Sequence, residues 1–230
     1  MQIHKEDKKL VLKYLPLVKS LAHRIHRHLP DTVDVNDLIG QGILAVLEST
    51  QRLDNTKNPE AYLKLRIKGA IYDYLRSLDF GSKSIRKRER EIKQTLERLT
   101  QELGREPTDD ELISALGEKP ETFYSDLQKI SASYILSLDD IFREGRSYEE
   151  VLSAKLGSPE ENVMEADLKE RIISAIKRLE QREQLVLQLL FYEEIPAKEV
   201  AKLLGVSMAR ISQIKSSAIE KLKSYLASAL

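Results

Sequence analysis

The sequence predicts an all-α fold of three small helical modules joined by linkers, with a helix-turn-helix in the C-terminal module. Apolar residues recur at steps of three and four along most of the 230 residues, which is typical of amphipathic helices. No segment alternates apolar and polar residues over enough positions to predict a strand. The length fits one large domain or two to three small ones, and breaks in the periodicity favour the latter.

The composition excludes several classes of protein. With 41% hydrophobic residues and only 9 glycines and 7 prolines, the chain can bury cores and is not disordered. It has no cysteine, which rules out disulfides, thiolate zinc sites and cysteine nucleophiles. No apolar run approaches the ~18 residues of a membrane span, and the N-terminus lacks a signal-peptide core. We expect a soluble, cytoplasmic protein without a cofactor.

The net charge of zero conceals a separation of charge along the chain. Residues 61–98 hold 11 basic against 5 acidic residues, and residues 201–230 hold 5 against 1. Between them, residues 99–136 hold 3 basic against 8 acidic residues, and residues 137–170 hold 4 against 10. Blocks of this length predict separate surfaces with different partners, although chance clustering in a highly charged chain would also produce them.

The first predicted module, residues 1–80, contains three helices. Its boundary is the break in periodicity at Phe80-Gly81-Ser82. The apolar lines of the helices run through Leu10, Leu15, Val18, Leu21, Ala22 and Ile25; through Leu38, Ile39, Ile43, Leu44 and Leu47; and through Leu63, Ile67, Ala70, Ile71, Tyr74 and Leu75.

The second predicted module, residues 81–136, begins with a strongly basic helix that ends at Gly104. Thr108 and Glu111 predict a capping box at the start of a short helix, which ends at Gly117. Another amphipathic helix then completes the module.

A linker and a third module follow. Residues 137–163 lose the periodicity and are rich in acids, which predicts a flexible acidic linker. The third module spans residues 164–230, where an apolar line returns through Leu168, Ile172, Ile173, Ile176, Leu179, Val186, Leu187, Leu190 and Phe191.

A twenty-residue frame that begins at Ala197 matches a helix-turn-helix. Ala201 is the small residue needed where the two helices cross, and Gly205 lies at the turn, where positive φ is favoured. Ser207 is placed to cap the second helix. The positions where the helices face each other are apolar: Val200, Leu204, Val206, Ile211 and Ile214. An ordinary helical hairpin with a glycine turn is the alternative, which the complete pattern disfavours.

The second helix of this motif carries side chains suited to DNA. Arginine and glutamine can contact base edges in the major groove, and Lys215 and Lys221 can contact phosphates. The excess of positive charge in residues 201–230 agrees with this prediction. The residues expected to point outward are Met208, Ala209, Arg210, Ser212, Gln213 and Ser216.

The basic block 61–98 predicts a second contact with DNA. Aromatic rings stack on exposed bases while cations follow the backbone, a combination that suits single-stranded or opened DNA. Individual tyrosines of this set are at least as well explained as core or interface residues. The block interleaves Tyr62, Tyr72 and Tyr74 with Lys64, Arg66, Lys68 and Arg76.

In its order of parts the chain resembles the bacterial RNA polymerase sigma factors. The resemblance covers essentially the whole chain, and RIKGAIYDYLRSLDF followed by SIRKR is most similar to the motility (flagellar) branch. The segments that carry it are 37–48 (DLIGQGILAVLE), 61–80 (AYLKLRIKGAIYDYLRSLDF), 84–88 (SIRKR), 137–140 (SLDD), and 179–183 (LEQRE) through the helix-turn-helix.

The resemblance implies an alternative sigma factor that binds core RNA polymerase, directs it to specific flagellar promoters and assists initiation. The three modules would be sigma regions 2, 3 and 4, and the acidic linker would thread the polymerase channel. The last module would bind the β flap, and an anti-sigma factor would grip this module and the linker. The implied partners include no membrane and no small-molecule substrate.

The resemblance also implies roles for particular residues. The β′ clamp helices would contact Asp37, Leu38, Gln41 and Leu44. The −10 element and the DNA just upstream would contact Tyr62, Lys64, Arg66, Lys68, Asp73, Arg76, Arg86, Arg88 and Arg90. The −35 element would be recognised by Ser207, Met208, Arg210, Ser212, Gln213 and Lys215.

Three departures from the family pattern modify these roles. Leu65 and Arg66 stand where housekeeping members carry paired tryptophans, which implies weaker aromatic wedging at the melting step. Gly40 replaces a side chain that often contacts polymerase. Met208 and Ala209 replace charged base readers, so the −35 preference should differ.

Two other functions compete with this interpretation. A stand-alone helix-turn-helix transcriptional regulator would explain residues 171–230 but not the basic block or the helix at 37–48. An enzyme is disfavoured, since the sequence has neither a phosphate-cradling glycine loop nor a defensible Ser/His/Asp spacing. The four histidines, His4, His23, His26 and His28, have no carboxylate or cysteine partner to complete a metal site, so we expect surface histidines.

The charge separation leads to one further hypothesis. In the free protein, the acidic stretch 99–170 would attract the basic DNA-binding faces, bring the modules together and hide those faces. The net charge of zero would then suit a protein that binds DNA only after polymerase separates its parts.

Overall fold

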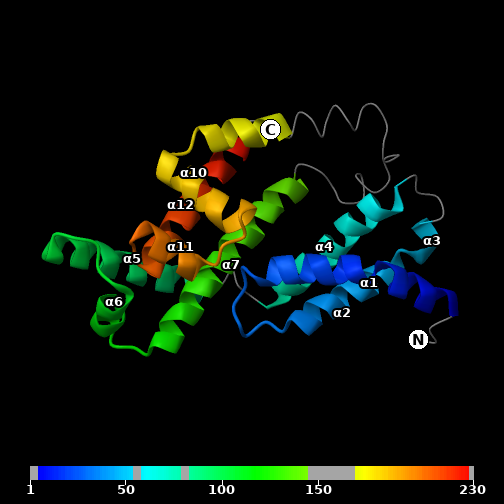
Figure 1. Cartoon of the computed structure of the whole chain (residues 1–230), viewed down its shortest axis with the longest axis horizontal. Helices are drawn as coiled ribbons and strands as arrows, with labels where there is room; N and C mark the ends of the chain where they lie inside the picture. The colour runs from blue at the N-terminus through cyan, green and yellow to red at the C-terminus, as the bar shows by residue number, and fades with distance from the viewer. Residues whose placement is uncertain (1–4, 54–57, 79–82, 145–168, 228–230) are drawn as a thin grey trace. The chain divides into compact units, whose positions relative to one another are not determined.

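The computed structural model describes residues 5–53, 58–78, 83–144 and 169–227, and all the regular structure among them is helical (Figure 1). This result confirms the predicted all-α fold. The described residues divide into two compact units. The N-terminal unit lies within Met1–Asp79 and Phe142–Leu168, and the C-terminal unit lies within Phe80–Ile141 and Lys169–Leu230.

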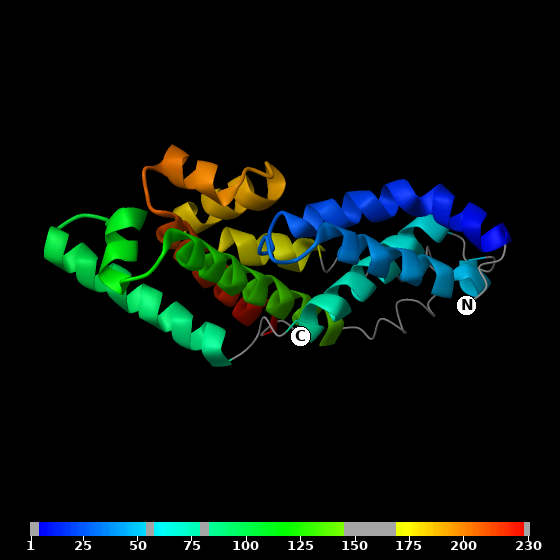
Figure 2. The ribbon, with the colours of Figure 1, turned by 90° about the horizontal axis from the view of Figure 1, so that it is seen from below.

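The N-terminal unit contains α1 (Lys5–His26), α2 (Val35–Glu48), α3 (Thr50–Leu53) and α4 (Pro59–Ser77). Figures 1 and 2 show α1, α2 and α4 packed side by side. Side chains define where two of these helices begin. The Asp34 carboxylate accepts the Asn36 N–H at 2.8 Å before α2, and Asn58 accepts the Ala61 N–H at 3.1 Å before α4.

The core of this unit is made where the three long helices meet. A glycine permits their close approach: a Cβ at Gly42 would lie 2.6 Å from Val18 Cγ1 and 3.2 Å from Ile67 Cγ2. The side chains that are at most 2% exposed include Val18, Ala22, Leu38, Val46, Tyr62, Leu63, Ile67, Ile71 and Leu75.

The C-terminal unit begins with α5 (Lys83–Leu103), α6 (Asp109–Leu116) and α7 (Pro120–Glu144). The predicted capping box is confirmed: the Thr108 hydroxyl accepts the Glu111 N–H at 3.2 Å, and Glu111 accepts the Thr108 N–H at 2.8 Å. Gly104 and Gly117 follow their helices with φ of +66° and +69°, as expected for glycines that end a helix.

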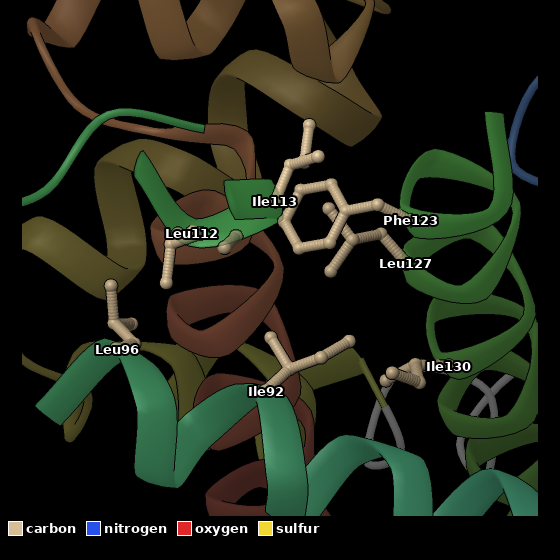
Figure 3. Close-up of a cluster of buried hydrophobic side chains, with 8 residues drawn as sticks. Ile92, Leu96, Leu112, Ile113, Phe123, Leu127 and Ile130 are labelled. Atoms are coloured by element: carbon tan, nitrogen blue, oxygen red, sulfur yellow. The ribbon is translucent and has the colours of Figure 1, made fainter. Parts of the chain in front are cut away.

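One apolar cluster holds α5, α6 and α7 together (Figure 3). Phe123, which is 0% exposed, lies in this cluster, and Ala209 from the C-terminal helix is buried in the same cluster. The side chains labelled in Figure 3 are Ile92 and Leu96 from α5, Leu112 and Ile113 from α6, and Phe123, Leu127 and Ile130 from α7.

Helix α7 continues into the segment that the sequence predicts to be a linker. Residues 137–144 are helical, while 145–163 lie outside the described residues. The helix therefore extends eight residues beyond the point where the apolar periodicity fades. Loss of periodicity here does not mark the end of the helix.

The rest of the C-terminal unit contains a helical stretch at 169–177, then α10 (Gln181–Leu187), the π-helical turn η1 (Gln188–Tyr192), α11 (Ala197–Leu204) and α12 (Met208–Ala227). Gly205, with φ of +64°, makes the predicted turn between α11 and α12. Ser207 accepts the Arg210 N–H at 3.2 Å, as its predicted capping role requires.

Helix α12 lies at the centre of this unit. It packs against α10, η1 and α11 through Ile211 and Ile214, and against the 169–177 helix through Ala218 and Leu222. Phe191, the last residue of the predicted apolar line, is 41% exposed, whereas Val186 and Leu190 are buried. A π-helical turn interrupts the α-helix within this stretch.

Candidate polymerase and nucleic-acid interfaces

Helix α2 presents a partly exposed face that fits the predicted contact with polymerase. Asp37 is exposed, Gln41 is half-buried and Leu44 is 47% exposed. Steps of four and three residues place these side chains on one side of the helix. The structure does not support Leu38 as a contact residue, because it is 0% exposed and packs into the core.

A hydrogen bond joins this face to helix α4. The Tyr74 hydroxyl donates to Asp37 Oδ2 at 3.1 Å. Burial, followed by the nearby carboxylates of Asp37 and Asp34, raises the pKa of Tyr74 above its ordinary value. At the other end of α2, Arg66 lies 3.5 Å from Glu48. The candidate polymerase face and the candidate −10 helix are thus joined by polar contacts at two places.

Most of the predicted −10 residues lie on α4 at the surface, but Tyr62 does not. Lys64 and Lys68 are exposed, and Lys64 forms an ion pair with Glu60 at 2.9 Å. Asp73 and Arg76 pair with each other at 3.2 Å. Tyr62 is 2% exposed, and its hydroxyl has no hydrogen-bond partner among the described residues. Tyr62 is therefore a core residue and cannot stack on a base in this structure.

The predicted upstream contacts lie on α5, and one of them is a structural residue. Arg86 and Arg90 are exposed. Arg88 is partly buried and lies 2.8 Å from Asp126 on α7 and 2.9 Å from Glu91, and it also bonds to Glu118. Although burial opposes the charged form, these carboxylates raise the pKa of Arg88.

Arg88 is therefore not available to DNA in this structure. Its side chain ties α5 to α7 and to the loop after α6. The sequence pattern of a basic cluster could not show this, since Glu118 and Asp126 lie 30 and 38 residues further along the chain.

The N-terminus of α12 is covered by acidic side chains from the start of α6. The Asp109 carboxylate accepts the N–H groups of Met208 at 3.0 Å and Ala209 at 3.3 Å. Glu106 Oε1 lies 3.1 Å from Arg210 Nε, and Arg210 also donates to Gln213. Burial raises the pKa of Asp109, although the two N–H donors act in the opposite direction.

The other predicted −35 residues are also covered. Lys215 is 6% exposed, donates to Ser131 on α7 and lies 5.1 Å from the centre of the Phe191 ring. Burial lowers the pKa of Lys215 to about 8. Ala209 and Ser216 are buried, while Met208, Ser212 and Gln213 are half-buried.

The predicted outward face of α12 therefore faces α5, α6 and α7 in this structure. Met208 also packs against the cluster that includes Val200 and Ala201 of α11. The sequence pattern could not identify which helices cover this face. Lys221, a predicted phosphate contact, is engaged as well: its ammonium lies 2.8 Å from Glu180 and 2.7 Å from Glu183.

A cavity of about 320 Å³ opens beside this contact within the C-terminal unit. Tyr134 lies in its wall and donates to Glu89 on α5 at 2.8 Å and to Glu220 on α12 at 3.3 Å. Burial raises the pKa of Glu89, and burial together with the two carboxylates raises that of Tyr134. Polar contacts thus link α12 to α5 and α7 along its length.

The described ranges contain neither a membrane-spanning helix nor a metal-binding cluster. No helix there is long and apolar enough to cross a membrane. Over the same ranges, no group of three or more histidine, aspartate or glutamate side chains is arranged to hold a metal ion.

The chain matches three families that occur together in one class of protein. Residues 10–80 match Sigma-70 region 2, residues 87–163 match Sigma-70 region 3, and residues 175–224 match Sigma-70, region 4. The chain therefore belongs to the sigma-70 family of RNA polymerase sigma factors. A stand-alone regulator is not favoured, because the chain matches regions 2 and 3 in addition to the helix-turn-helix region.

Within this family the chain is similar to the flagellar sigma factors. It is 36% identical to the RNA polymerase sigma factor FliA of Salmonella typhimurium over 218 residues, which cover 93% of this chain and 91% of that protein. It is 31% identical to FliA of Pseudomonas aeruginosa over 229 residues, with 98% and 93% covered. It is 30% identical to the sigma-D factor of Bacillus subtilis over 223 residues, with 94% and 88% covered.

Solved structures agree with these relatives. The cocrystal structure of the flagellar sigma/anti-sigma complex Sigma-28/FlgM superposes with a TM-score of 0.89. The aligned chain is 49% identical, and 96% of each chain is covered. The predicted resemblance to the motility branch of the alternative sigma factors is confirmed.

Proposed function

We propose that this chain binds core RNA polymerase, directs it to flagellar promoters through the −10 and −35 elements, and assists promoter opening. The observation that carries the proposal is the arrangement of the N-terminal unit. There the partly exposed Asp37, Gln41 and Leu44 face lies on α2, and the exposed cations lie on α4, which packs against α2. Polymerase and DNA can thus be held by two faces of one small unit.

The modules divide this work as follows. Residues 1–80 act as region 2, which holds polymerase and the −10 element, and residues 81–136 act as region 3 on the DNA upstream. Residues 137–163 form the acidic linker, and residues 164–230 act as region 4 on the −35 element. The protein acts as an initiation factor in the cytoplasm, and the polymerase supplies the catalysis.

The polymerase β flap and an anti-sigma factor are the further protein partners that we propose. Large apolar side chains are exposed on the described surface of the last module, which favours a protein partner there: Leu185, Phe191, Tyr192 and Leu203 are 41%, 41%, 81% and 66% exposed. The complex of the relative Sigma-28 with FlgM supports an anti-sigma factor of that type.

Transcription in vitro with core polymerase on a promoter library tests the proposal. We expect initiation from a subset of promoters that share −10 and −35 elements. Leu44→Asp should weaken binding to core polymerase by about tenfold or more, since it places a charge in an apolar contact. Leu12→Asp is the matched control, because Leu12 is 61% exposed on α1 and outside the proposed face.

The experiment distinguishes failure of the proposed function from failure of the proposed α2 contact. Failure of the wild-type chain to direct initiation anywhere would overturn the proposed function. Equal losses for the Leu44 and Leu12 variants would instead remove the α2 face from the proposal and leave the function in place.

A further inference from the structure

The hydroxyl of Tyr74 is used at a place that its sequence neighbours do not suggest. The sequence groups Tyr74 with the tyrosines of the basic block, which suit stacking on exposed bases. In the structure Tyr74 is half-buried, and its hydroxyl donates to Asp37 Oδ2 at 3.1 Å, from α4 to the first turn of α2. Asp37 is the first residue of the face that we propose for polymerase. A side chain of the candidate −10 helix therefore reaches the proposed polymerase site.

Two carboxylates stand at the start of α2, and Asp34 is the one that caps the helix. Asp34 accepts the Asn36 N–H at 2.8 Å, which is the usual role of a capping aspartate. The Asp37 carboxylate instead accepts a hydrogen bond from a residue that lies 37 positions later in the chain. The contact between Asp37 and Tyr74 thus depends on the packing of α4 against α2 and not on local capping.

Tyr74 approaches Asp37 from a rigid part of α4. Ile71 and Leu75, on the same helix, are 0% exposed and fix it in the core of the unit. The Ser77 hydroxyl donates to the Tyr74 carbonyl at 2.6 Å, which holds the last turn of the helix. A hydrogen bond from such a fixed donor restricts the rotamers of an exposed aspartate, so the side chain is already ordered when a partner arrives.

The hydrogen bond from Tyr74 leaves Asp37 able to bind a second group. A carboxylate has two oxygens, and Asp37 is exposed, so the oxygen opposite Oδ2 can accept a hydrogen bond from a cation or an N–H group of a partner. Burial, and then the hydrogen bond to Asp37, raises the pKa of Tyr74, so the hydroxyl keeps its proton and remains a donor at neutral pH.

We propose that Tyr74 is a positioning residue for the polymerase contact, because its hydroxyl orients the Asp37 carboxylate toward a cationic or N–H donor group of the polymerase. This inference rests on the proposed function. It extends the polymerase site from α2 onto α4, so that one turn of α4 serves both partners. Tyr74 acts there on the polymerase contact, while its neighbours Asp73 and Arg76 belong to the proposed −10 surface.

Tyr74→Phe removes the hydroxyl and keeps the ring. The affinity of the full chain for core polymerase is measured by competition with wild-type chain labelled through Ser114→Cys, since the chain has no other cysteine and Ser114 is exposed on α6. We expect Tyr74→Phe to weaken binding by about three- to tenfold, which corresponds to ordering one side chain at an interface. Tyr14→Phe, which removes the hydroxyl of a half-buried tyrosine on α1, is the matched control and should leave the affinity unchanged.

Double-mutant cycles separate this role from a general structural one. In an Asp37→Ala background, Tyr74→Phe should have no further effect on affinity, because the carboxylate that it orients is gone. In a Leu44→Ala background the loss should remain in full, because Leu44 makes an independent contact. In transcription, the defect of Tyr74→Phe should disappear at saturating concentrations of the variant, because Asp73 and Arg76 are still in place for the −10 element.

Unchanged polymerase affinity in Tyr74→Phe would overturn the inference. Equal losses from Tyr74→Phe in the wild-type and Asp37→Ala backgrounds would also overturn it, because they would show an effect that does not pass through Asp37. A transcription defect that persists at saturation would assign the hydroxyl to promoter DNA instead. A circular dichroism melt of each variant verifies that it is folded. The proposed function fails independently, through transcription with wild-type protein.

Discussion

Two glycines of α2 lie in opposite surroundings. Gly40 is exposed, and a Cβ built there would have no atom within 4 Å, while a Cβ at Gly42 would lie 2.6 Å from Val18 Cγ1. We expect Gly40→Ala to raise the free energy of unfolding by about 0.5–1 kcal/mol, since alanine restricts the unfolded chain. Gly42→Ala should lower it by about 1–3 kcal/mol through overpacking.

Urea unfolding of the full chain, followed by circular dichroism, measures both effects. The pair controls for the change of residue type, because only the surroundings differ. Equal effects at positions 40 and 42 would contradict the close approach of α1 and α2 at Gly42.

The capping box before α6 predicts a response to acid. Hydrogen bonds from Arg105, then from the Thr108 backbone, lower the pKa of Glu111 to about 2. Because the folded-state pKa lies below the ordinary value, this carboxylate contributes stability that is complete above about pH 4.5 and is lost as the pH falls towards 2. We expect Glu111→Gln to lower the melting temperature at pH 7 and to flatten its fall in that window.

Thr108→Ala tests the other half of the same box. Loss of this cap should cost about 1 kcal/mol at neutral pH, without changing the acid response of Glu111 through Arg105. A chemical denaturation series between pH 2 and 7 distinguishes the two variants. An unchanged acid response in Glu111→Gln would show that another carboxylate is responsible.

Single residues show where sequence patterns stop being informative. Periodicity predicted that residues 37–48 are helical and placed Leu38 in the apolar line, whereas the resemblance to sigma factors named Leu38 as a polymerase contact. Leu38 is 0% exposed, so it is a core residue. In the sequence, Arg88 belongs to the same basic cluster as Arg86 and Arg90, and only the folded structure shows that it pairs with carboxylates on other elements. The partners of a charged side chain depend on tertiary packing, which local sequence does not encode.

At the scale of an element, α12 carries a buried cation. Burial lowers the pKa of Lys215 to about 8, so between pH 8 and 10.5 the unfolded chain keeps a proton that the folded unit has released. Stability attributable to Lys215 therefore rises with pH across this window, by up to about 3 kcal/mol at about 1.4 kcal/mol per pKa unit. Lys215→Met should remove this rise.

The measurement is the difference in unfolding free energy between wild type and Lys215→Met at a series of pH values. The advantage of methionine at pH 7 should shrink as the pH rises from 8 to 10.5. Lys202→Met is the control, because Lys202 is exposed on α11. A difference that does not change with pH would mean that Lys215 is in water, as it would be if α12 were separated from α7.

Elements also differ in how far the sequence predicts them. The turn between α11 and α12 was predictable because Gly205 and Ser207 act locally, and the structure confirms both. The π-helical turn at η1 was not predictable from apolar spacing, since one inserted residue leaves the pattern of apolar residues nearly intact. The contact of Asp109 with the N-terminus of α12 was not predictable either, because Asp109 lies about a hundred residues earlier in the chain.

For the molecule as a whole, the structure shows how one part of the acidic stretch meets one of the basic segments. The acidic stretch 99–136 supplies Glu106 and Asp109 to the basic C-terminal segment within one compact unit. These contacts join one part of the acidic stretch to the helix-turn-helix, while the attraction of the whole stretch 99–170 to the basic DNA-binding faces stays a prediction. The second and third predicted modules pack together, although their patterns of apolar residues look independent.

The two compact units lead to the last prediction. Each unit has its own buried core, with Ile67 and Leu38 in the first and Phe123 and Leu96 in the second, all at most 2% exposed. We expect two separable unfolding transitions, since cooperative unfolding follows the extent of a core. Gly42→Ala should lower hydrogen-exchange protection within 5–78 only. Phe123→Ala, at a cost of about 3–5 kcal/mol, should lower it within 83–141 and 169–227.

Hydrogen exchange followed by mass spectrometry resolves the two sets of peptides in one experiment. Protection should fall across α12 in the Phe123 variant, because the cluster around Phe123 includes Ala209. Leu12→Ala, at a side chain that is 61% exposed, should leave both sets unchanged. Loss of protection in α5–α7 with α12 unaffected would contradict a single C-terminal unit, and with it the covered state of the −35 helix.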